Sequence, residues 1–204
     1  IRNPRFLALV SRPSLLHIVA DLWEKENLSK RIDSLNSADV LGLFVSRSYR
    51  MQGRKEGDEQ RLMSLNSAER DYFMQGVATY MATEGLNNQI SGEDLNQVID
   101  KLIQVIPDSV STETSVTSGE EQRPLKHRLH EIEDYEDVRT DVRTCGLLVD
   151  DPVASNTFKF GHKSFMEYLF ACAAKEFLDL SQGTEKARAI FNATGAQLEI
   201  QLEQ

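Results

Sequence analysis

The stretch from Thr157 to Phe177 changes its pattern partway along, and this change constrains the fold more than any other feature. Its first residues, Thr157-Phe-Lys-Phe160, alternate in polarity as a half-buried strand does. Gly161 interrupts the alternation, and a helical run that is apolar nearly all round follows, which is typical of a buried helix. The pattern therefore predicts a strand, a turn and a helix, with the lone histidine His162 at the junction and Ser164 in the first helical turn.

Helical spacing of apolar residues dominates the rest of the chain. Two of the predicted helices start with an Asn-Ser-Ala-Asp or Asn-Ser-Ala-Glu string, in which the asparagine caps the helix and the acidic residue three positions on completes a capping box. These residues are Asn36 with Asp39 and Asn66 with Glu69. The predicted helices cover residues 3–10, 13–27, 36–51, 66–85, 91–106, 135–145, 162–177 and 184–204.

One β-hairpin is expected among these helices. Leu147-Leu-Val149 and Thr157-Phe-Lys-Phe160 are short apolar segments separated by a polar seven-residue turn. The helix before them ends at Gly146, a residue that commonly follows a helix end. Helix, helix, hairpin and a further helix is the order of a winged-helix unit. The predicted fold class is mainly α, a helical bundle followed by a winged-helix domain with one short β-hairpin.

The expected domain organisation follows from these elements. A helical domain covers residues 1–57, a winged-helix domain covers 62–180, and a C-terminal helix covers 184–204. Residues 108–123 contain only Val110 and Val116 as large aliphatic side chains, so too little apolar surface is available there to offset the entropy of ordering. This segment is predicted to be a mobile loop inside the winged-helix domain.

Charge and composition limit the class of partner. The formal net charge is −9, and Lys and Arg occur singly along the chain, whereas a nucleic-acid surface needs clustered cations. No apolar run approaches the roughly 20 residues of a membrane span. Cys145 and Cys172 both lie in apolar patterns, which favours reduced core thiols and a cytoplasmic location. Because the chain starts at Ile1 with a helix-start pair at Asn3-Pro4, we expect it to be part of a longer protein.

The sequence offers little chemistry of its own. It has no Gly-x-x-x-x-Gly-Lys-Ser/Thr and no Gly-x-Gly-x-x-Gly, so we expect no phosphate-binding loop in this chain. His127 and His130 have a spacing that a metal could use, but no second ligand cluster supports them, and two solvated histidines are the simpler interpretation. Ser164 has no acid partner beside His162 in the sequence, so nucleophilic catalysis is not expected.

Three segments resemble the region downstream of the P-loop in NACHT-type STAND NTPases. They are Asn-Pro-Arg-Phe-Leu-Ala-Leu-Val-Ser-Arg-Pro-Ser-Leu-Leu at 3–16, Thr-Cys-Gly-Leu-Leu-Val at 144–149 and Phe-Lys-Phe-Gly-His-Lys-Ser-Phe-Met-Glu-Tyr-Leu-Phe-Ala at 158–171. The last is the most specific, and the first is degenerate because many helices start with Pro and Leu. The resemblance covers most of residues 1–180 and leaves 108–123 and the final helix without a counterpart.

The resemblance implies a nucleotide-dependent switch. In that family a helical domain and a winged-helix domain close over ADP bound by an upstream P-loop domain. By motif position, Pro13 is the residue that packs against the adenine and His162 is the histidine that hydrogen-bonds the β-phosphate. The structural alternatives are ordinary helix initiation for Pro13 and a hydrogen-bonded histidine that fixes the turn for His162.

The resemblance also implies partners and cofactors. The full-length parent is expected to bind ATP or ADP with magnesium, to contact its upstream P-loop domain in cis, and to form a homo-oligomer when activated in defence or stress signalling. The isolated fragment is expected to hydrolyse nothing and to bind nucleotide weakly if at all.

Two other functions remain open at this point. A DNA-binding winged-helix regulator would place Tyr135–Cys145 in the major groove, where Arg139 and Arg143 would meet phosphates, although Glu136, Asp137 and Asp141 on the same helix would repel them. A passive helical interaction scaffold would need neither nucleotide nor DNA.

Overall fold

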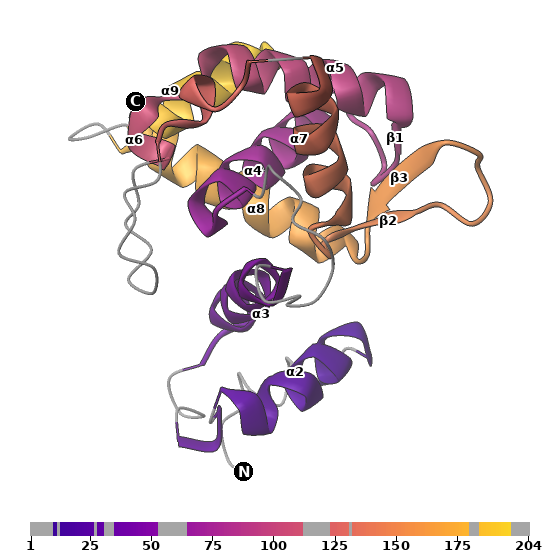
Figure 1. Ribbon diagram of the computed structural model, residues 1–204. Helices are drawn as coiled ribbons and strands as arrows, with labels where there is room; N and C mark the ends of the chain where they lie inside the picture. The colour runs from indigo at the N-terminus through magenta and orange to yellow at the C-terminus, as the bar shows by residue number, and fades with distance from the viewer. Residues whose placement is uncertain are drawn as a thin grey trace, which may run out of the picture.

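The computed structural model describes residues 10–11, 13–26, 28–30, 35–52, 65–111, 123–130, 132–179 and 184–196. Within these ranges the chain is mainly helical and carries one small antiparallel sheet (Figure 1). The helices are α2 (Pro13–Lys25), η1 (Leu28–Lys30), α3 (Ser37–Gln52), α4 (Ser67–Thr83), α5 (Gly92–Val105), α6 (Asp108–Ser111), η2 (Leu125–His127), α7 (Ile132–Thr144), α8 (Lys163–Leu178) and α9 (Glu185–Thr194). The strands are β1 (Ile90–Ser91), β2 (Leu148–Asp150) and β3 (Thr157–Phe160).

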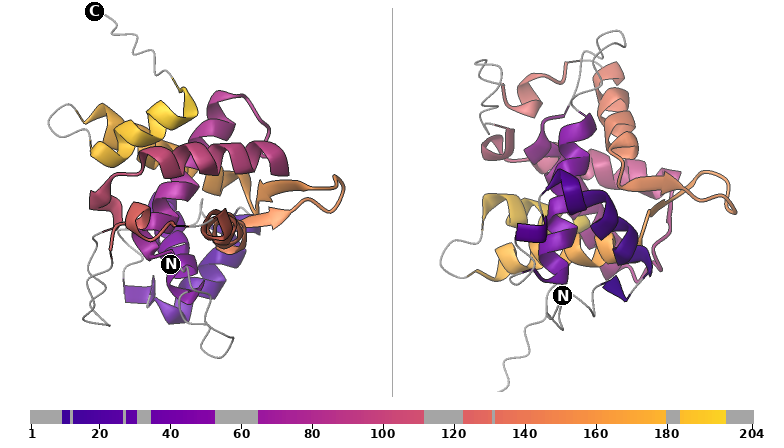
Figure 2. Two further views of the ribbon diagram at one scale, coloured as in Figure 1. Left: turned by 45° about the horizontal axis from the view of Figure 1, so that its top comes forward. Right: turned by 90° about the horizontal axis from the view of Figure 1, so that it is seen from below.

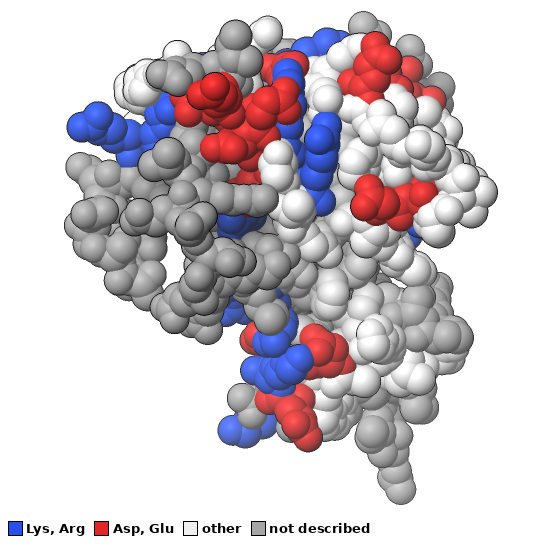
Figure 3. All heavy atoms as spheres, turned by 45° about the vertical axis from the view of Figure 1, so that its right-hand side comes forward, with Lys and Arg blue, Asp and Glu red and all other residues white. Residues whose placement is uncertain are grey.

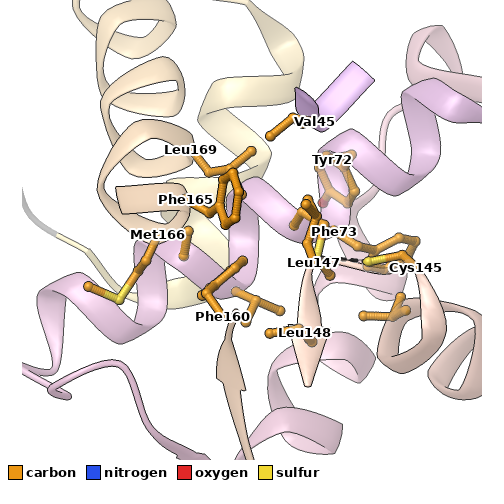
Figure 4. Packing of buried hydrophobic residues seen from close by; sticks show 14 of the residues in the cluster. Val45, Tyr72, Phe73, Cys145, Leu147, Leu148, Phe160, Phe165, Met166 and Leu169 are labelled. Carbon is orange, nitrogen blue, oxygen red and sulfur yellow. Dashed lines mark hydrogen bonds between the residues drawn. The ribbon is translucent and has the colours of Figure 1, made fainter. Parts of the chain in front are cut away.

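Helix α4 is the centre of the fold, and α3, α5, α7, α8 and α9 all contact it. It starts with the predicted capping box, in which the Asn66 side chain accepts the Glu69 N–H and the Glu69 carboxylate accepts the Asn66 N–H. Tyr72 and Phe73 of α4 are fully buried. Figure 4 shows them in one cluster with side chains of α3, the β2–β3 hairpin and α8, including Phe160 and Phe165.

The sheet has three strands in the order β1-β3-β2, and both pairings are antiparallel. The predicted β2–β3 hairpin is confirmed, with Leu148 opposite Phe160, and it projects away from the helices in Figures 1 and 2. Strand β1 was not predicted, because a two-residue strand is too short to alternate visibly. Just before β1, the side chain of Asn88 exchanges two hydrogen bonds with the backbone of Phe160, which fixes this edge of the sheet.

Helices α2 and α3 lie together on one side of the molecule (Figure 1), and α3 packs on both α4 and α8. The predicted cap of α3 is confirmed, since Asn36 and Asp39 exchange hydrogen bonds of 3.0 Å. The rings of Phe44 in α3 and Phe165 in α8 stack with their centroids 5.1 Å apart. A single hydrophobic cluster contains buried residues from α2 and α3 as well as from the helices around α4.

The helix that follows the hairpin is not apolar-buried all round, contrary to the sequence pattern. The buried stripe of α8 consists of Phe165, Met166, Leu169 and Ala173. Ala171 and Leu178 are exposed on the opposite side. The reason is that α4 and its neighbours cover only one side of α8, so apolar residues outside that stripe stay at the surface.

Two predicted boundaries are also wrong. The mobile loop expected at 108–123 is helical at its start, because α6 buries Val110 and Ser111, and the Ser111 hydroxyl accepts the Leu125 N–H at 3.0 Å. The helix expected at 184–204 ends at Thr194, because Gly195 takes a left-handed conformation with φ of 67°. Residues 3–9 of the helix predicted at 3–10 lie outside the described residues. The same holds for residues 112–122 of the predicted loop and residues 197–204 of the predicted C-terminal helix.

Candidate functional site at the β3–α8 junction

His162 is the N-cap residue of α8. Its backbone is extended, with φ of −144° and ψ of 139°, and its Nδ1 accepts the backbone N–H of Ser164 at 3.1 Å. Gly161, just before it, donates its N–H to the Leu147 carbonyl at 2.9 Å, so the chain leaves the sheet in a fixed direction. The histidine is half-buried. This geometry agrees with the predicted strand, turn and helix at this point.

The capping hydrogen bond determines which imidazole nitrogen carries the proton. A nitrogen that accepts an N–H has no proton of its own, so the neutral ring of His162 is protonated at Nε2. Within the described part of the chain, Nε2 has no hydrogen-bond partner. His162 therefore presents one N–H donor outward from the start of a helix.

The first turn of α8 adds positive potential to this donor. The backbone N–H groups of a first helical turn carry the positive end of the helix dipole and favour anions. Lys163 adds an ammonium group on a side chain that is 54% exposed. Its partner Glu167 lies 3.9 Å away and is 60% exposed, so that ion pair is weak. The arrangement can hold an anionic group.

The same geometry does not fit acid–base or nucleophilic catalysis by His162 and Ser164. In a catalytic triad the histidine donates its Nδ1–H to a carboxylate and accepts the serine proton at Nε2. Here Nδ1 accepts a backbone N–H instead, so a carboxylate cannot orient the ring. The serine is placed as part of the cap and not as a nucleophile.

Pro13, the second predicted site residue, is the first residue of α2. Its ring is outside the side chains that the structure describes, so the structure gives its place in the helix but no contact of the ring. The position is that of a proline which starts a helix, where its missing N–H costs nothing.

The structure places His127 and His130 at and just after the end of a short helix. His127 ends this helix, η2, and His130 lies in the coil after it. The backbone N–H of His130 donates a hydrogen bond to the Asp134 carboxylate. Among the residues that the structure describes, no group of three or more His, Cys, Asp or Glu side chains is placed to hold a metal ion.

The two arginines of α7 are turned toward the protein and not outward. The guanidinium of Arg139 binds the Asp100 carboxylate through two hydrogen bonds of 3.0 and 2.6 Å and also contacts Glu136, and these carboxylates raise its pKa. The guanidinium of Arg143 contacts Asn96 and lies over the Phe158 ring, 5.5 Å from its centroid. On the face shown in Figure 3, the Lys and Arg side chains of the described residues lie beside acidic ones and form no continuous basic patch.

A second site candidate is a cavity of about 730 Å³ between α3, α4, α6 and α9. Sequence reasoning missed it, because its lining residues Tyr49, Asp71 and Lys186 are far apart in the chain and none belongs to a motif. The ammonium of Lys186 lies 2.7 Å from Asp71 and 3.5 Å from Glu176. Although burial alone would lower the pKa of Lys186, these two carboxylates raise it. The cluster is therefore an ion network that joins α9 to α4 and α8.

Comparison with known proteins identifies no relative of this chain. No protein-family model, no curated protein and no solved structure matches it. No described helix is both long enough and apolar enough to cross a membrane.

Proposed function

We propose that this chain is the regulatory part of a NACHT-type STAND signalling NTPase. In this proposal a helical domain and a winged-helix domain close over ADP or ATP that, with magnesium, is bound by a P-loop domain elsewhere in the full-length protein. The nucleotide state then controls homo-oligomerisation in defence or stress signalling, in the cytoplasm. The chain itself is regulatory and not catalytic.

The observation that carries the proposal is the engaged Nδ1 of His162. Because the Ser164 N–H occupies Nδ1, the free Nε2–H is the only ring group left to meet a ligand, and that ligand must be a hydrogen-bond acceptor. A phosphate oxygen fits this requirement and also fits the positive end of α8 and the ammonium of Lys163. The capping role and the nucleotide role are therefore compatible, since they use opposite sides of one ring.

The magnitude of such a contact suits a switch. A hydrogen bond to a charged group contributes about 1.5 to 3 kcal/mol. If the bond forms only in the closed state, it shifts the equilibrium between closed and open states by about one to two decades. That shift is large enough to hold an ADP-bound protein closed and small enough for a signal to overcome.

The order of elements supports the winged-helix part of the proposal. Along the chain the order is α4, β1, α5, α6, η2, α7, β2 and β3, and β1 lies at the edge of the hairpin beside β3. If the winged helix binds protein and nucleotide instead of DNA, the helix before its hairpin, here α7, does not need to be basic. The inward pairing of Arg139 and Arg143 accordingly favours this use of the fold over DNA binding.

The test compares His162→Asn with the wild type in the full-length protein. Asparagine is a good N-cap, so its side-chain oxygen can accept the Ser164 N–H, but it has no group at the position of Nε2–H. We expect ADP to dissociate about ten- to a hundredfold faster from the variant and basal signalling to rise, with thermal stability little changed. His162→Ala should add the loss of the cap, about 1 kcal/mol of stability.

Unchanged ADP dissociation and unchanged basal signalling in His162→Asn would contradict the proposal and leave His162 as a capping residue only. The full-length protein must also contain a Gly-x-x-x-x-Gly-Lys-Ser/Thr loop within about 250 residues before Ile1, and its absence would exclude the proposed family.

A further inference from the structure

The cavity between α3, α4, α6 and α9 receives the starts of two helices. It is lined by the first two residues of α4, Ser67 and Ala68, and by the first two residues of α9, Glu185 and Lys186. The N–H groups in the first turn of a helix have no acceptor within the helix and carry the positive end of its dipole. The N-cap side chain of each helix accepts the third of these N–H groups. The first two have no acceptor among the described residues, so they are available to a ligand.

Two side chains of α3 add donors to the same cavity. The guanidinium of Arg50 is 59% exposed and contacts Glu26 through one nitrogen at 3.3 Å, which leaves its other N–H groups for a second partner. Ser46 contributes a hydroxyl group to the wall. Helix starts, a guanidinium and hydroxyl groups together favour an anionic group with several acceptor oxygens, as a phosphate has.

The wall of the cavity also contains a buried hydroxyl without a partner. Tyr49 is 3% exposed, and its hydroxyl makes no hydrogen bond with any described residue. Burial raises the pKa of this hydroxyl and the Asp71 carboxylate raises it further, so the phenol keeps its proton. A buried donor that lacks an acceptor costs about 1 to 3 kcal/mol. A ligand oxygen would supply the acceptor, whereas an ammonium group, which only donates, would not.

Asp71 in the same wall needs a different ligand group. Its Oδ2 accepts hydrogen bonds from Lys186 at 2.7 Å and from Gln75 at 2.8 Å. Its Oδ1 has no donor among the residues that the structure describes. An anionic group is repelled by this carboxylate, but a hydroxyl group can donate to it. The cavity therefore combines two helix starts that suit an anion with a carboxylate that suits a hydroxyl group.

We infer that this cavity binds a small phosphorylated polyol, with its phosphate at the first turns of α4 and α9 and its hydroxyl groups at Asp71 and Tyr49. The volume of about 730 Å³ lies in the range of small-molecule sites, roughly 300 to 1,000 Å³, and a phosphate ion alone would fill only a small part of it. The site shares no residue with the β3–α8 junction, so it stands or falls independently of the proposed function.

The experiment is a titration of the 204-residue chain with glycerol 3-phosphate, followed by amide NMR spectra. Saturable shifts are expected for the amides at the two helix starts, with a dissociation constant of about 1 mM or below. Inorganic phosphate should bind at least about tenfold more weakly, because it makes no hydroxyl contacts. Equal binding of inorganic phosphate would indicate an adventitious ion only and would overturn the inference. Glycine, a zwitterion with an ammonium group, should not shift these signals, and tighter binding of glycine would also overturn it.

The start of α3 provides a matched control. It has the same Asn-Ser-Ala-acidic string as the start of α4, but its first turn is exposed and lies outside the cavity. Ala68→Glu places a carboxylate in the cavity, in a first helical turn where a negative charge is tolerated, and should abolish binding. Ala38→Glu makes the same change at the same position of α3 and should bind as the wild type does. Unchanged binding in Ala68→Glu, or an equal loss in both variants, would contradict the site.

Tyr49→Phe tests the buried hydroxyl. No hydrogen bond to a described residue is lost, so the melting temperature should not fall. Glycerol 3-phosphate should bind about three- to tenfold more weakly, because the ligand oxygen loses its donor. Binding equal to that of the wild type would overturn the inference, whether or not the melting temperature changes.

Discussion

The guanidinium of Arg70 and the carboxylate of Asp141 form an ion pair inside the protein, with Nη2 of the arginine 3.2 Å from Oδ2 of the aspartate. Their side chains are only 4% and 11% exposed. The same carboxylate accepts the Leu65 N–H at 2.7 Å, and the same guanidinium donates to the Tyr49 carbonyl at 3.0 Å. One pair of charges therefore ties the end of α3, the start of α4 and the middle of α7 together.

Removing one partner of this pair should be strongly destabilising. Asp141→Ala leaves the Arg70 charge buried and the Leu65 N–H without its acceptor, so we expect a loss of about 3 to 5 kcal/mol in the free energy of unfolding. Urea unfolding followed by circular dichroism measures it. Glu133→Ala, at an exposed position of the same helix, is the control and should change stability by less than about 0.5 kcal/mol. A loss below about 1 kcal/mol for Asp141→Ala would show that the pair is not buried as described.

Local chemistry accounts for the parts of the fold that the sequence predicted correctly. Asparagine caps at Asn36 and Asn66 act within three residues of themselves, and the β2–β3 hairpin closes within thirteen, so the chain's own pattern specifies them. The residues of strand β1 pair with residues 66 and 68 positions away in sequence, and Arg70 meets Asp141 from 71 residues away. No local pattern carries such contacts, because they arise only when the helices are packed.

The position of His162 at a strand-to-helix junction could be predicted from the sequence. The alternation of polar and apolar residues in β3 ends at Gly161, and helical spacing of apolar residues begins in α8. The capping hydrogen bond at Nδ1 could not be predicted. It depends on the extended backbone of the histidine and on the direction of the chain as it leaves β3. The exposed side of α8 was also missed, because apolar composition alone does not show which stripe its neighbours cover.

The two cysteines should differ in reactivity. Burial raises the pKa of the Cys145 thiol to about 11, and its sulfur lies 3.2 Å from the sulfur of Met74. At pH 8 only about one Cys145 in a thousand is then a thiolate, which is the reactive form. Cys172 is half-buried, and burial raises its pKa as well. Native alkylation, followed by peptide mass spectrometry, should modify Cys172 first and Cys145 only after unfolding in urea. Equal rates in the native protein would contradict the buried position of Cys145.

Acid should weaken the hairpin through Asp151. Its carboxylate accepts the Val153 N–H at 3.1 Å and a further hydrogen bond from Gln89, and these bonds hold its pKa below the ordinary value. In the unfolded chain the pKa returns to about 3.9. The unfolded state then binds more protons below about pH 4, so the stabilisation is present above that pH and is lost as the pH falls.

We therefore expect Asp151→Asn to reduce the fall of the melting temperature between pH 6 and pH 3 relative to wild type. Thermal melts at a series of pH values provide the measurement, with Asp150→Asn, at the adjacent and more exposed carboxylate, as the control. An acid sensitivity in Asp151→Asn identical to that of the wild type would show that Asp151 is not hydrogen-bonded in this way.

The contact of α3 with α8 depends on Gly42. A Cβ at this position would lie 2.6 Å from the hydroxyl oxygen of Tyr168, closer than such atoms approach. Alanine favours the helix by about 1 kcal/mol over glycine. Gly42→Ala therefore raises the helix propensity of α3 but crowds the Tyr168 side chain. In a Tyr168→Phe background the obstructing oxygen is absent. A double-mutant cycle by urea unfolding should therefore show that Gly42→Ala changes the free energy of unfolding more favourably in the Tyr168→Phe background than in the wild type, by about 1 to 2 kcal/mol. A coupling near zero would mean that the two helices do not approach so closely.

His162 caps α8 through Nδ1, and we propose that it donates Nε2–H to a nucleotide phosphate. Nitrogen-15 spectra of the histidine rings in the full-length protein with bound ADP test it most directly. We expect that Nδ1 of His162 is unprotonated, that Nε2 is protonated, and that the Nε2 proton shifts downfield when ADP is bound. A ring protonated at Nδ1, or an Nε2 signal that ADP does not change, would contradict it.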